Sequence, residues 1–214
     1  MIPLSLPDGP LEVLCLGAHP DDVEIAVGGT LLELAARGDV SATWLVMTGS
    51  PERQAENRVA AESFLPGAVV HFLDLPDGRL PVHWDEVKNA LEDLARTVRP
   101  HVILAPAVDD SHQDHRLVGQ LVSTVWRNAL VLHYEIPKWD GDLRPVTHYV
   151  PVSPENARRK VELLDAAFLS QVDRDWWDEE MFLGLMRLRG IECRSRYAEG
   201  FTVAKATLAV GAPS

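Results

Sequence analysis

The chain has 214 residues, of which 46% are hydrophobic and 24% charged, a composition typical of a globular domain and not of a disordered chain. Its net charge of −12 argues against nucleic acid and anionic membranes as main partners, and Cys15 and Cys193 form no CxxC pair that would indicate a disulfide framework or a cysteine-rich zinc site. No signal-peptide pattern and no apolar run of about 18 residues is present, so we expect a cytoplasmic protein.

Short apolar runs alternate with helical patterns along the first two thirds of the chain. The apolar runs predict strands at 11–17, 40–47, 69–73, 101–105 and 131–136. The segments around them predict helices at 29–37, 51–65, 83–98 and 114–130. Pro51 lies in the first turn of the predicted helix at 51–65, a position that favours proline. Pro100 ends the strongly amphipathic helix predicted at 83–98. Such alternation predicts a parallel sheet with helices on both faces.

The last third of the chain is less regular. It predicts a strand at 149–152, helices at 154–168 and 176–188, and a final strand at 201–204. Because no Gly/Ser-rich linker separates this part from the rest, we assign residues 1–214 to a single domain. The expected fold class is α/β, with a Rossmann-like, mostly parallel sheet.

Two loops are rich in groups that can do chemistry. They follow the first and fourth predicted strands and together hold three histidines and six acidic residues, within 18–24 and 109–115. In a doubly wound sheet, ligands bind beyond the carboxyl ends of the strands, where the strand order reverses. In the commonest order this point lies between the first and fourth strands. The sequence therefore predicts a functional site there.

The residue types in these loops suit a catalytic metal centre, which has three N or O ligands and one open position. One loop can supply a histidine and an aspartate, and the other a second histidine. The remaining groups can act as acid, base or supporting partners. Taken alone, the first motif could be a helix N-cap turn, and an HxxH pair is common on helices. Both motifs together at the switch point favour the metal centre.

Several other nucleotide and nucleophile motifs are absent from the sequence. Gly28-Gly29-Thr30 does not match the G-x-G-x-x-G pattern of dinucleotide-binding proteins. We interpret these glycines instead as positions where the start of a helix packs closely against the sheet. No P-loop and no G-x-S-x-G nucleophile elbow occurs either.

The two motifs resemble those of a known family. Ala18-His19-Pro20-Asp21-Asp22, followed by Gly28-Gly29-Thr30-Leu31, looks like the opening of the LmbE-like (PIG-L) de-N-acetylases. His112-Gln113-Asp114-His115 matches their second motif, H-x-D-H. The paired motifs are specific. Supporting similarities that extend over most of the chain occur around Arg53 and Glu56, at Ser170-Gln171, and at Arg196-Tyr197-Ala198-Glu199.

The resemblance implies an enzyme that removes the N-acetyl group from an N-acetylglucosamine-type amino-sugar conjugate, using one Zn²⁺ per chain and a metal-activated water. It implies His19, Asp22 and His115 as zinc ligands. It implies Asp21 as the general base. The implied roles of the remaining residues are stabilisation of the oxyanion by His112, orientation of that histidine by Asp114, and substrate contact by Arg53.

The sequence departs from the family pattern two residues before the first histidine of the second motif. Some members carry a tyrosine there, and this chain carries Asp110, so zinc and His112 would have to stabilise the oxyanion without a phenol. From the residues alone, Arg53 could equally form a surface salt bridge with Glu52 or Glu56. Glu135 and Lys138, at and just after the end of the fifth predicted strand, could also line the site. The side chains of Trp139, Trp176 and Trp177 could stack on a sugar or a neighbouring subunit, although packing is their commoner fate, so the roles of all five residues are left open.

Two rival functions remain open from the sequence. A metal-dependent phosphohydrolase would use the acidic second loop for a two-metal centre, and a non-enzymatic sugar- or nucleotide-binding module would need no general base. Metal stoichiometry and sensitivity to chelation separate them. The identity of the amino-sugar conjugate, occupation by Fe(II) or Co(II) instead of zinc, and a homo-oligomeric state are also left open.

Overall fold

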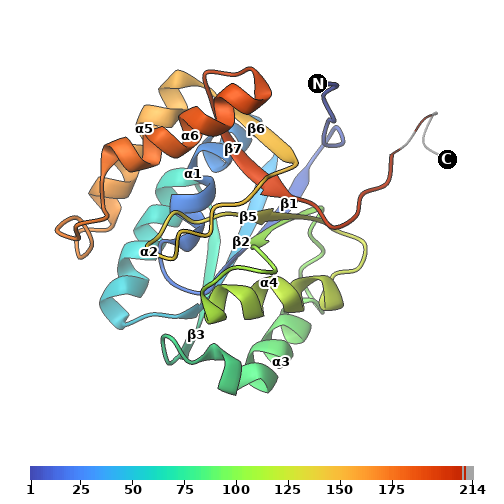
Figure 1. Cartoon of the computed structure of the whole chain (residues 1–214). Coiled ribbons are helices and arrows are strands. Elements are labelled where there is room, and N and C mark those ends of the chain that lie inside the picture. The colour runs from blue at the N-terminus through green and yellow to red at the C-terminus, as the bar shows by residue number, and fades with distance from the viewer. Residues whose placement is uncertain (209, 211–214) are drawn as a thin grey trace.

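The computed structural model of the chain describes residues 1–208 and 210 (Figure 1). Its strands form one sheet in the order β3-β2-β1-β4-β5-β7-β6. The strands are β1 (Leu11–Gly17), β2 (Val40–Thr48), β3 (Val69–Leu75), β4 (Val102–Pro106), β5 (Leu130–Tyr134), β6 (His148–Val152) and β7 (Tyr197–Thr202). Strands β1 to β5 are parallel, and β7 is antiparallel to its neighbours β5 and β6. The predicted mostly parallel sheet is confirmed.

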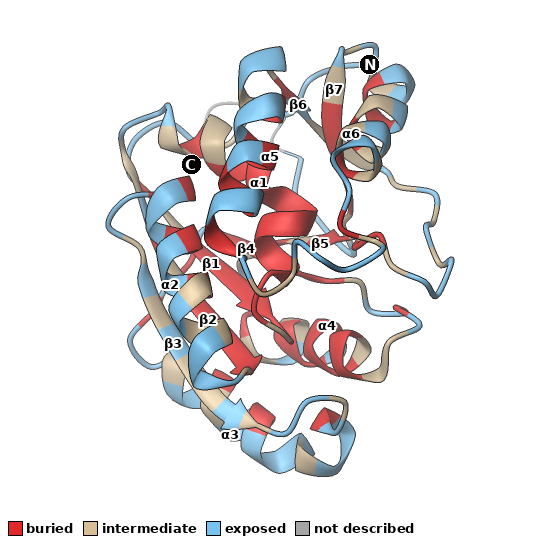
Figure 2. Ribbon diagram, turned by 90° about the vertical axis from the view of Figure 1, so that its left-hand side faces the viewer, coloured by how far each residue is buried: buried red, intermediate tan, exposed pale blue. Residues whose placement is uncertain are grey.

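Helices cover both faces of this sheet, as the sequence predicts. They are α1 (Asp22–Ala35), α2 (Pro51–Phe64), α3 (Trp84–Leu94), α4 (Gln113–Val125), α5 (Pro154–Ala167) and α6 (Glu179–Cys193). The main apolar core joins the sheet to α1, α2, α5 and α6, and a second core joins its other face to α3 and α4 (Figure 2). No helix of the described residues is long and apolar enough to cross a membrane.

The strand order reverses between β1 and β4, which are hydrogen-bonded neighbours at the centre of the sheet. The chain runs from β1 towards β2 and β3 on one side, and β4 and β5 lie on the other. The loops after β1 and β4 therefore leave the sheet side by side at its carboxyl edge. The predicted switch point is confirmed, and it places the two motifs together.

Helix α1 begins seven residues before the predicted start at Gly29. It contains a kink at Val27 (φ −132°, ψ 17°), which divides it into two helical pieces. The carboxylate of Glu199 on β7 accepts hydrogen bonds from the backbone N–H groups of Gly29 (2.8 Å) and Thr30 (2.6 Å) at the start of the second piece. The sequence pattern detects that second piece, although a partner 170 residues away caps its start, whereas the first piece belongs to the loop motif that contains Asp22.

Close packing explains the glycines of this second piece. A Cβ atom on Gly28 would lie 2.7 Å from the Phe64 ring of α2, and one on Gly29 would lie 2.8 Å from a methyl carbon of Val152 on β6. The packing interpretation of Gly28-Gly29 therefore holds, with helix α2 and strand β6 as the neighbours.

Three other elements have boundaries that differ from the prediction. Helix α4 ends at Val125 instead of 130, because Trp126 adopts an extended backbone conformation (φ −99°, ψ 91°). Helix α6 begins at Glu179 instead of 176, because the Asp178 side chain caps it, and it runs on to Cys193 instead of 188. Strand β7 begins four residues before the predicted start at 201, so that it can pair with the whole of β6.

Candidate active site

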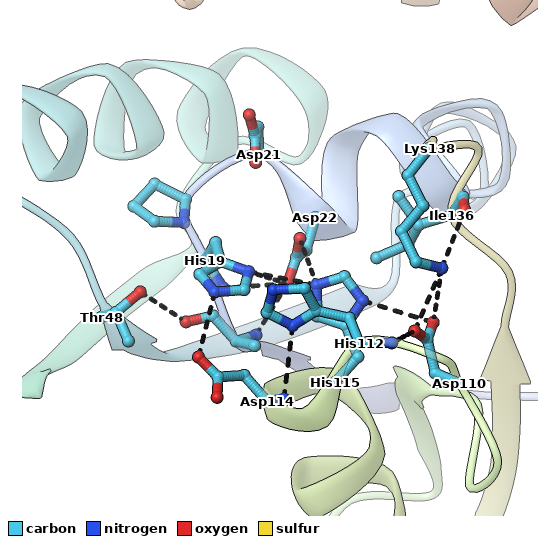
Figure 3. Close-up of polar contacts among 12 residues, drawn as sticks. His19, Asp21, Asp22, Thr48, Asp110, His112, Asp114, His115, Ile136 and Lys138 are labelled. Atoms are coloured by element: carbon cyan, nitrogen blue, oxygen red, sulfur yellow. Dashed lines mark hydrogen bonds and ion pairs between the residues drawn. The ribbon is translucent and has the colours of Figure 1, made fainter. Parts of the chain in front are cut away.

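The β1–α1 loop is built around the side chain of Asp22. Its Oδ2 accepts hydrogen bonds from the backbone N–H groups of Ala18 (2.8 Å) and His19 (2.9 Å), so the carboxylate is fixed at the start of α1. The preceding residue, Asp21, has a left-handed backbone conformation (φ 104°, ψ −23°). This turn directs the two neighbouring aspartates in different directions (Figure 3).

The side chains of His19, Asp22 and His115 converge at the end of β1 and the start of α4 (Figure 3). His19 Nδ1 lies 3.1 Å from His115 Nε2, His115 Nε2 lies 3.3 Å from Asp22 Oδ1, and His19 Nδ1 lies 3.6 Å from Asp22 Oδ2. The ring of His112 is adjacent, with its centroid 5.0 Å from that of His19 and 4.6 Å from that of His115.

These three residues fit a metal ion. Two ligands of a tetrahedral zinc ion, each at about 2.0–2.1 Å from the metal, lie roughly 3.3–3.4 Å apart. The observed spacings of 3.1 to 3.6 Å bracket that value, although the two imidazoles reach different oxygens of Asp22, His115 Nε2 to Oδ1 and His19 Nδ1 to Oδ2. Two imidazoles with one carboxylate are a donor set found in catalytic zinc sites. His112 also brings a ring nitrogen within 4.8 Å of ligand atoms of His19 and His115.

Carboxylates stand behind both imidazole ligands. His115 Nδ1 lies 3.3 Å from Asp110 Oδ2, which holds a proton on Nδ1 and leaves Nε2 as the nitrogen that a metal ion would bind in place of its proton. His19 Nε2 lies 3.0 Å from Asp77 Oδ1 and 3.4 Å from Asp114 Oδ2. The ring orientation gives His19 Nε2 no well-directed hydrogen bond in the described structure, so both contacts are electrostatic in character.

The electrostatics of the centre favour a cation. Burial raises the pKa of Asp22, but the adjacent His115 and His19 outweigh burial and hold the pKa well below its usual range. Burial lowers the pKa of His115, but Asp22 and Asp110 outweigh it and raise the pKa to about 9. The carboxylates therefore stay ionised and attract positive charge, which is what a divalent metal ion supplies.

Asp21 faces away from this centre towards Arg53 of α2. Its Oδ2 accepts a 2.6 Å ion-paired hydrogen bond from Arg53 Nη2, which also donates to the carbonyl of Pro20. Burial raises the pKa of Asp21 to about 6, and Arg53 opposes this rise. Among the protein groups around Asp21, burial therefore outweighs the positive charge of Arg53.

Arg53 is itself held by a second layer of contacts. Its Nη1 donates to Glu56 (3.0 Å) and to the hydroxyl of Ser170 (3.3 Å), and Ser170 in turn hydrogen-bonds to Glu56 (2.7 Å). The salt bridge with Glu56 that the sequence allowed is present. The predicted contact between Arg53 and substrate stays a prediction, because the guanidinium in this structure is engaged by Asp21 and Glu56.

His112 caps α4 through its ring. Its Nδ1 accepts a 3.3 Å hydrogen bond from the backbone N–H of Asp114, so the proton of the neutral ring lies on Nε2. Burial, together with the positive charges of His115 and His19, lowers the pKa of His112 and favours that neutral form. A neutral Nε2–H remains a hydrogen-bond donor, so protonation of the ring is not needed for that task.

The carboxylate of Asp114 contacts a different set of atoms from the one that the resemblance implies. It accepts hydrogen bonds from the backbone N–H groups of Gly78 (2.8 Å) and Leu80 (3.0 Å) and lies beside His19 Nε2. The backbone of Asp114, rather than its carboxylate, contacts the His112 ring. Asp114 therefore holds the 78–80 turn through two hydrogen bonds and lies beside the Nε2 atom of His19, the ring nitrogen that faces away from His115.

Sequence reasoning identified Asp110 only as a departure from the family pattern, not as a partner of His115, and it left the role of Lys138 open. Asp110 contacts His115 and Lys138, whose Nζ lies 3.0 Å from Asp110 Oδ1 (Figure 3). Of the other residues whose roles were left open, Glu135 lines a cavity together with Lys138, and the three tryptophans lie elsewhere. Glu135 pairs with Arg189, while Trp176 and Trp177 pack on each other near Phe182 and the Trp139 side chain is mainly exposed.

A cavity of about 480 Å³ lies beside the loop that follows β4 and carries Asp110 and His112 (the metal-centre loop). Its walls are the 107–110 segment, the ends of β5 and β7 and the 142–146 segment, and it includes Asp110 and Lys138. A volume of this order is within the range of small-molecule sites.

Comparison with known proteins agrees with this geometry. Residues 14–126, more than half of the chain, match the profile of the family described as PIG-L: GlcNAc-PI de-N-acetylase. The protein named uncharacterized deacetylase YaiS from Escherichia coli K12 is 31% identical over 137 residues, covering 58% of this chain and 74% of YaiS. The diacetylchitobiose deacetylase of Thermococcus kodakarensis is 30% identical over 127 residues, covering 51% of this chain and 47% of that protein.

Solved structures share the fold. The conserved protein TT1542 from Thermus thermophilus superposes with a TM-score of 0.74 at 25% identity, over 94% of this chain and 97% of that one. N,N'-diacetylchitobiose deacetylase from Pyrococcus horikoshii gives 0.69 at 20% identity, over 90% and 83%. GalB, the 4-carboxy-2-hydroxymuconate hydratase from Pseudomonas putida KT2440, gives 0.77 at 18% identity, over 95% and 100%.

The last two likenesses concern the fold alone, and the hydratase shows that this fold also carries another reaction. The family assignment rests instead on the matched segment 14–126, which contains both motifs of the centre and all three ligand candidates. The chain therefore belongs to the PIG-L (LmbE-like) family of deacetylases.

Proposed function

We propose that this chain is a zinc-dependent hydrolase, with one metal ion per chain, that removes the N-acetyl group from an N-acetylglucosamine-type amino-sugar conjugate. The observation that carries the proposal is the convergence of His19, Asp22 and His115 beside a buried carboxylate, Asp21, that is not part of the ligand set. Family membership and the deacetylase names of both curated relatives support the reaction.

The chemistry requires help because an acetamide is a poor electrophile and its amine is a poor leaving group. A zinc ion held by His19, Asp22 and His115 would polarise the acetyl carbonyl and lower the pKa of water. In this proposal Asp21 takes a proton from the attacking water and returns it to the departing amine, which requires its carboxylate to turn from Arg53 towards the centre when metal and substrate are bound. Its pKa of about 6 suits both tasks, since the carboxylate is ionised near neutral pH yet basic enough to accept a proton.

The two remaining residues of the second motif have complementary tasks. His112 donates from its neutral Nε2–H to the oxygen that gains charge in the transition state, and one such donor is worth on the order of 10²–10³ in rate. Asp114 restrains His19 and the 78–80 turn. Arg53 contacts substrate from the rim in this proposal, and it also holds Asp21 in place.

The amino-sugar substrate is inferred from relatives. The curated relative from Thermococcus kodakarensis is named for diacetylchitobiose, and the family profile for GlcNAc-PI. Structural neighbours include the teicoplanin deacetylase Orf2 and the A40926 pseudoaglycone deacetylase Dbv21, at 13% and 16% identity. The cavity of about 480 Å³ beside Asp110 offers room for part of such a conjugate.

One observation favours the rival with two metals. His19 Nε2, Asp77 and Asp114 form a second group whose ligand atoms lie within 4.8 Å of one another. It shares His19 with the first centre, and Asp114 already accepts two backbone hydrogen bonds. A second ion would need both nitrogens of one imidazole, which argues for a single metal.

The experiment is acetate release from a panel of N-acetylglucosamine conjugates, each assayed with and without a chelator and after zinc is restored. We expect chelator-sensitive release of acetate from at least one conjugate and one zinc ion per chain. Phosphate release from phosphate esters with two metal ions per chain would support the phosphohydrolase instead. Binding of a conjugate without any turnover, insensitive to the chelator, would support the binding module.

A further inference from the structure

A series of charged contacts leads from the ligand candidate His115 to the segment that follows β5. His115 Nδ1 lies 3.3 Å from Asp110 Oδ2. The Nζ atom of Lys138 lies 3.0 Å from Asp110 Oδ1 and 3.1 Å from Oδ2. The same Nζ contacts both carboxylate oxygens of Asp142, at 2.8 and 3.0 Å (Figure 3 draws the part from His115 to Lys138).

These contacts are shielded from water near the metal centre. The side chains of His115 and Asp110 are 4% and 3% exposed, and that of Lys138 is 15% exposed. Asp110 also accepts a 2.7 Å hydrogen bond from the backbone N–H of His112. Because a buried carboxylate is costly without partners, Asp110 depends on Lys138 for compensating charge.

The arrangement restrains the imidazole of His115 in two ways. The carboxylate behind Nδ1 selects the tautomer with the proton on that nitrogen, which leaves the Nε2 lone pair available 3.3 Å from Asp22. It also restricts rotation of the ring. Supporting carboxylates of this kind typically contribute about 10-fold to 100-fold in metal affinity.

Lys138 is placed by its own loop. Asp142, four residues later, accepts a 2.8 Å hydrogen bond from the backbone N–H of Ser111 and so ties the 138–142 segment to the metal-centre loop. A separate ion pair between Arg144 and Asp109 joins the same two segments. Asp109 and Arg144 have no hydrogen bond or ion pair with His115 among the described residues, which makes this pair a natural control.

We propose that Asp110 is a positioning residue for His115, held in place by Lys138, so that metal affinity depends on a lysine outside both motifs. The proposal rests on the proposed function, because it takes the His19, Asp22 and His115 centre as the metal site.

The test is a competition titration of the metal-free full chain with Zn²⁺ and a chromophoric chelator. We expect Asp110→Ala to bind zinc about 10-fold to 100-fold more weakly than the natural chain. Lys138→Met should weaken binding in the same direction, and Lys138→Arg should restore most of it because the positive charge is retained. Arg144→Met, the matched control, should leave zinc affinity unchanged.

A second readout separates positioning from a merely structural role. With Co²⁺ in place of zinc, the visible spectrum reports the ligand geometry, and we expect it to change in Asp110→Ala but not in Arg144→Met. Thermal unfolding of each metal-free variant verifies that it folds. If Asp110→Ala does not fold, the comparison of Lys138→Met with Lys138→Arg carries the test.

The outcomes distinguish this inference from the proposed function. Wild-type zinc affinity in Asp110→Ala and Lys138→Met, in a chain that binds one zinc ion and releases acetate, would overturn the inference alone. A natural chain that binds no metal would overturn both.

Discussion

Each histidine of the proposed metal centre has a carboxylate behind its distal nitrogen. Asp110 stands behind His115, while Asp114 and the exposed Asp77 stand behind His19. The family resemblance predicts the three proposed metal ligands, His19, Asp22 and His115, directly from the two motifs. It could not predict Asp110, because this residue reaches His115 only through the course of the 107–112 loop. The side-chain contacts of Asp114 likewise depend on the 78–80 turn, which lies more than 30 residues away in sequence.

His115 should be indispensable for metal binding. Replacement by alanine removes one of the three proposed ligands and one of the two imidazoles beside the buried Asp22, so we expect His115→Ala to lose both bound zinc and acetate release. Metal content measured after dialysis, together with the acetate assay, checks this. His148→Ala, on strand β6 away from the centre, is the control and should keep both. Full zinc occupancy in His115→Ala would contradict the assignment of ligands.

At the scale of elements, α4 is seated against the end of β4 by a glycine. A Cβ atom on Gly119 would lie 2.5 Å from the carbonyl oxygen of Pro106 and 2.8 Å from that of Ala107. Both neighbours are backbone atoms, so they cannot move aside cheaply. Because α4 begins with the second motif, this close approach sets the position of His112 and His115.

Gly119→Ala is therefore expected to destabilise the protein by about 1–3 kcal/mol and to weaken zinc binding. Urea unfolding of the metal-free protein and a zinc titration measure the two effects. Gly184→Ala is the matched control: this glycine lies in α6 with open space around it, and the substitution should stabilise by up to about 1 kcal/mol. Equal stability of the two variants would show that α4 has room to shift.

The elements themselves could largely be predicted from sequence, because buried parallel strands appear as apolar runs and amphipathic helices as a 3.6-residue period. Their boundaries could not be predicted where a distant residue decides them. Helix α1 is kinked at Val27, and its second piece begins where Glu199 of β7 accepts hydrogen bonds from Gly29 and Thr30. Strand β7 begins early because it pairs with β6. The antiparallel insertion of β7 between β5 and β6 also escaped the pattern, since strand order is a property of the whole sheet.

At the scale of the whole molecule, a buried ion pair joins the C-terminal third to the helix that carries Asp22. Lys160 of α5 donates to Glu199 (2.8 Å) and to the carbonyl of Ile25 (2.6 Å), and Glu199 accepts from Gly29 and Thr30. The side chains of Lys160 and Glu199 are each 3% exposed. The last third of the chain therefore helps to hold in place helix α1, which carries Asp22.

Removing one partner of this pair leaves a buried charge. We expect Lys160→Met to cost about 3–5 kcal/mol of unfolding free energy, measured by urea denaturation. Arg159→Met, one residue earlier, breaks an exposed pair with Glu162 and should cost at most about 1 kcal/mol. If both variants lost the same small amount of unfolding free energy, the ion pair that links α1, α5 and β7 would contribute little to stability.

Asp21 offers the most direct measurement of the central claim, that a metal ion and a separate carboxylate base together remove an acetyl group. Asn has the same size as Asp and tolerates the left-handed backbone conformation of this position (φ 104°), so Asp21→Asn should fold and keep the ligands intact. Zinc content and acetate release are measured on the same preparations of Asp21→Asn and the natural chain. We predict one zinc ion per chain in both, with release lowered by about 10²–10⁴-fold in the variant. Near-normal acetate release from the zinc-loaded variant would contradict the account.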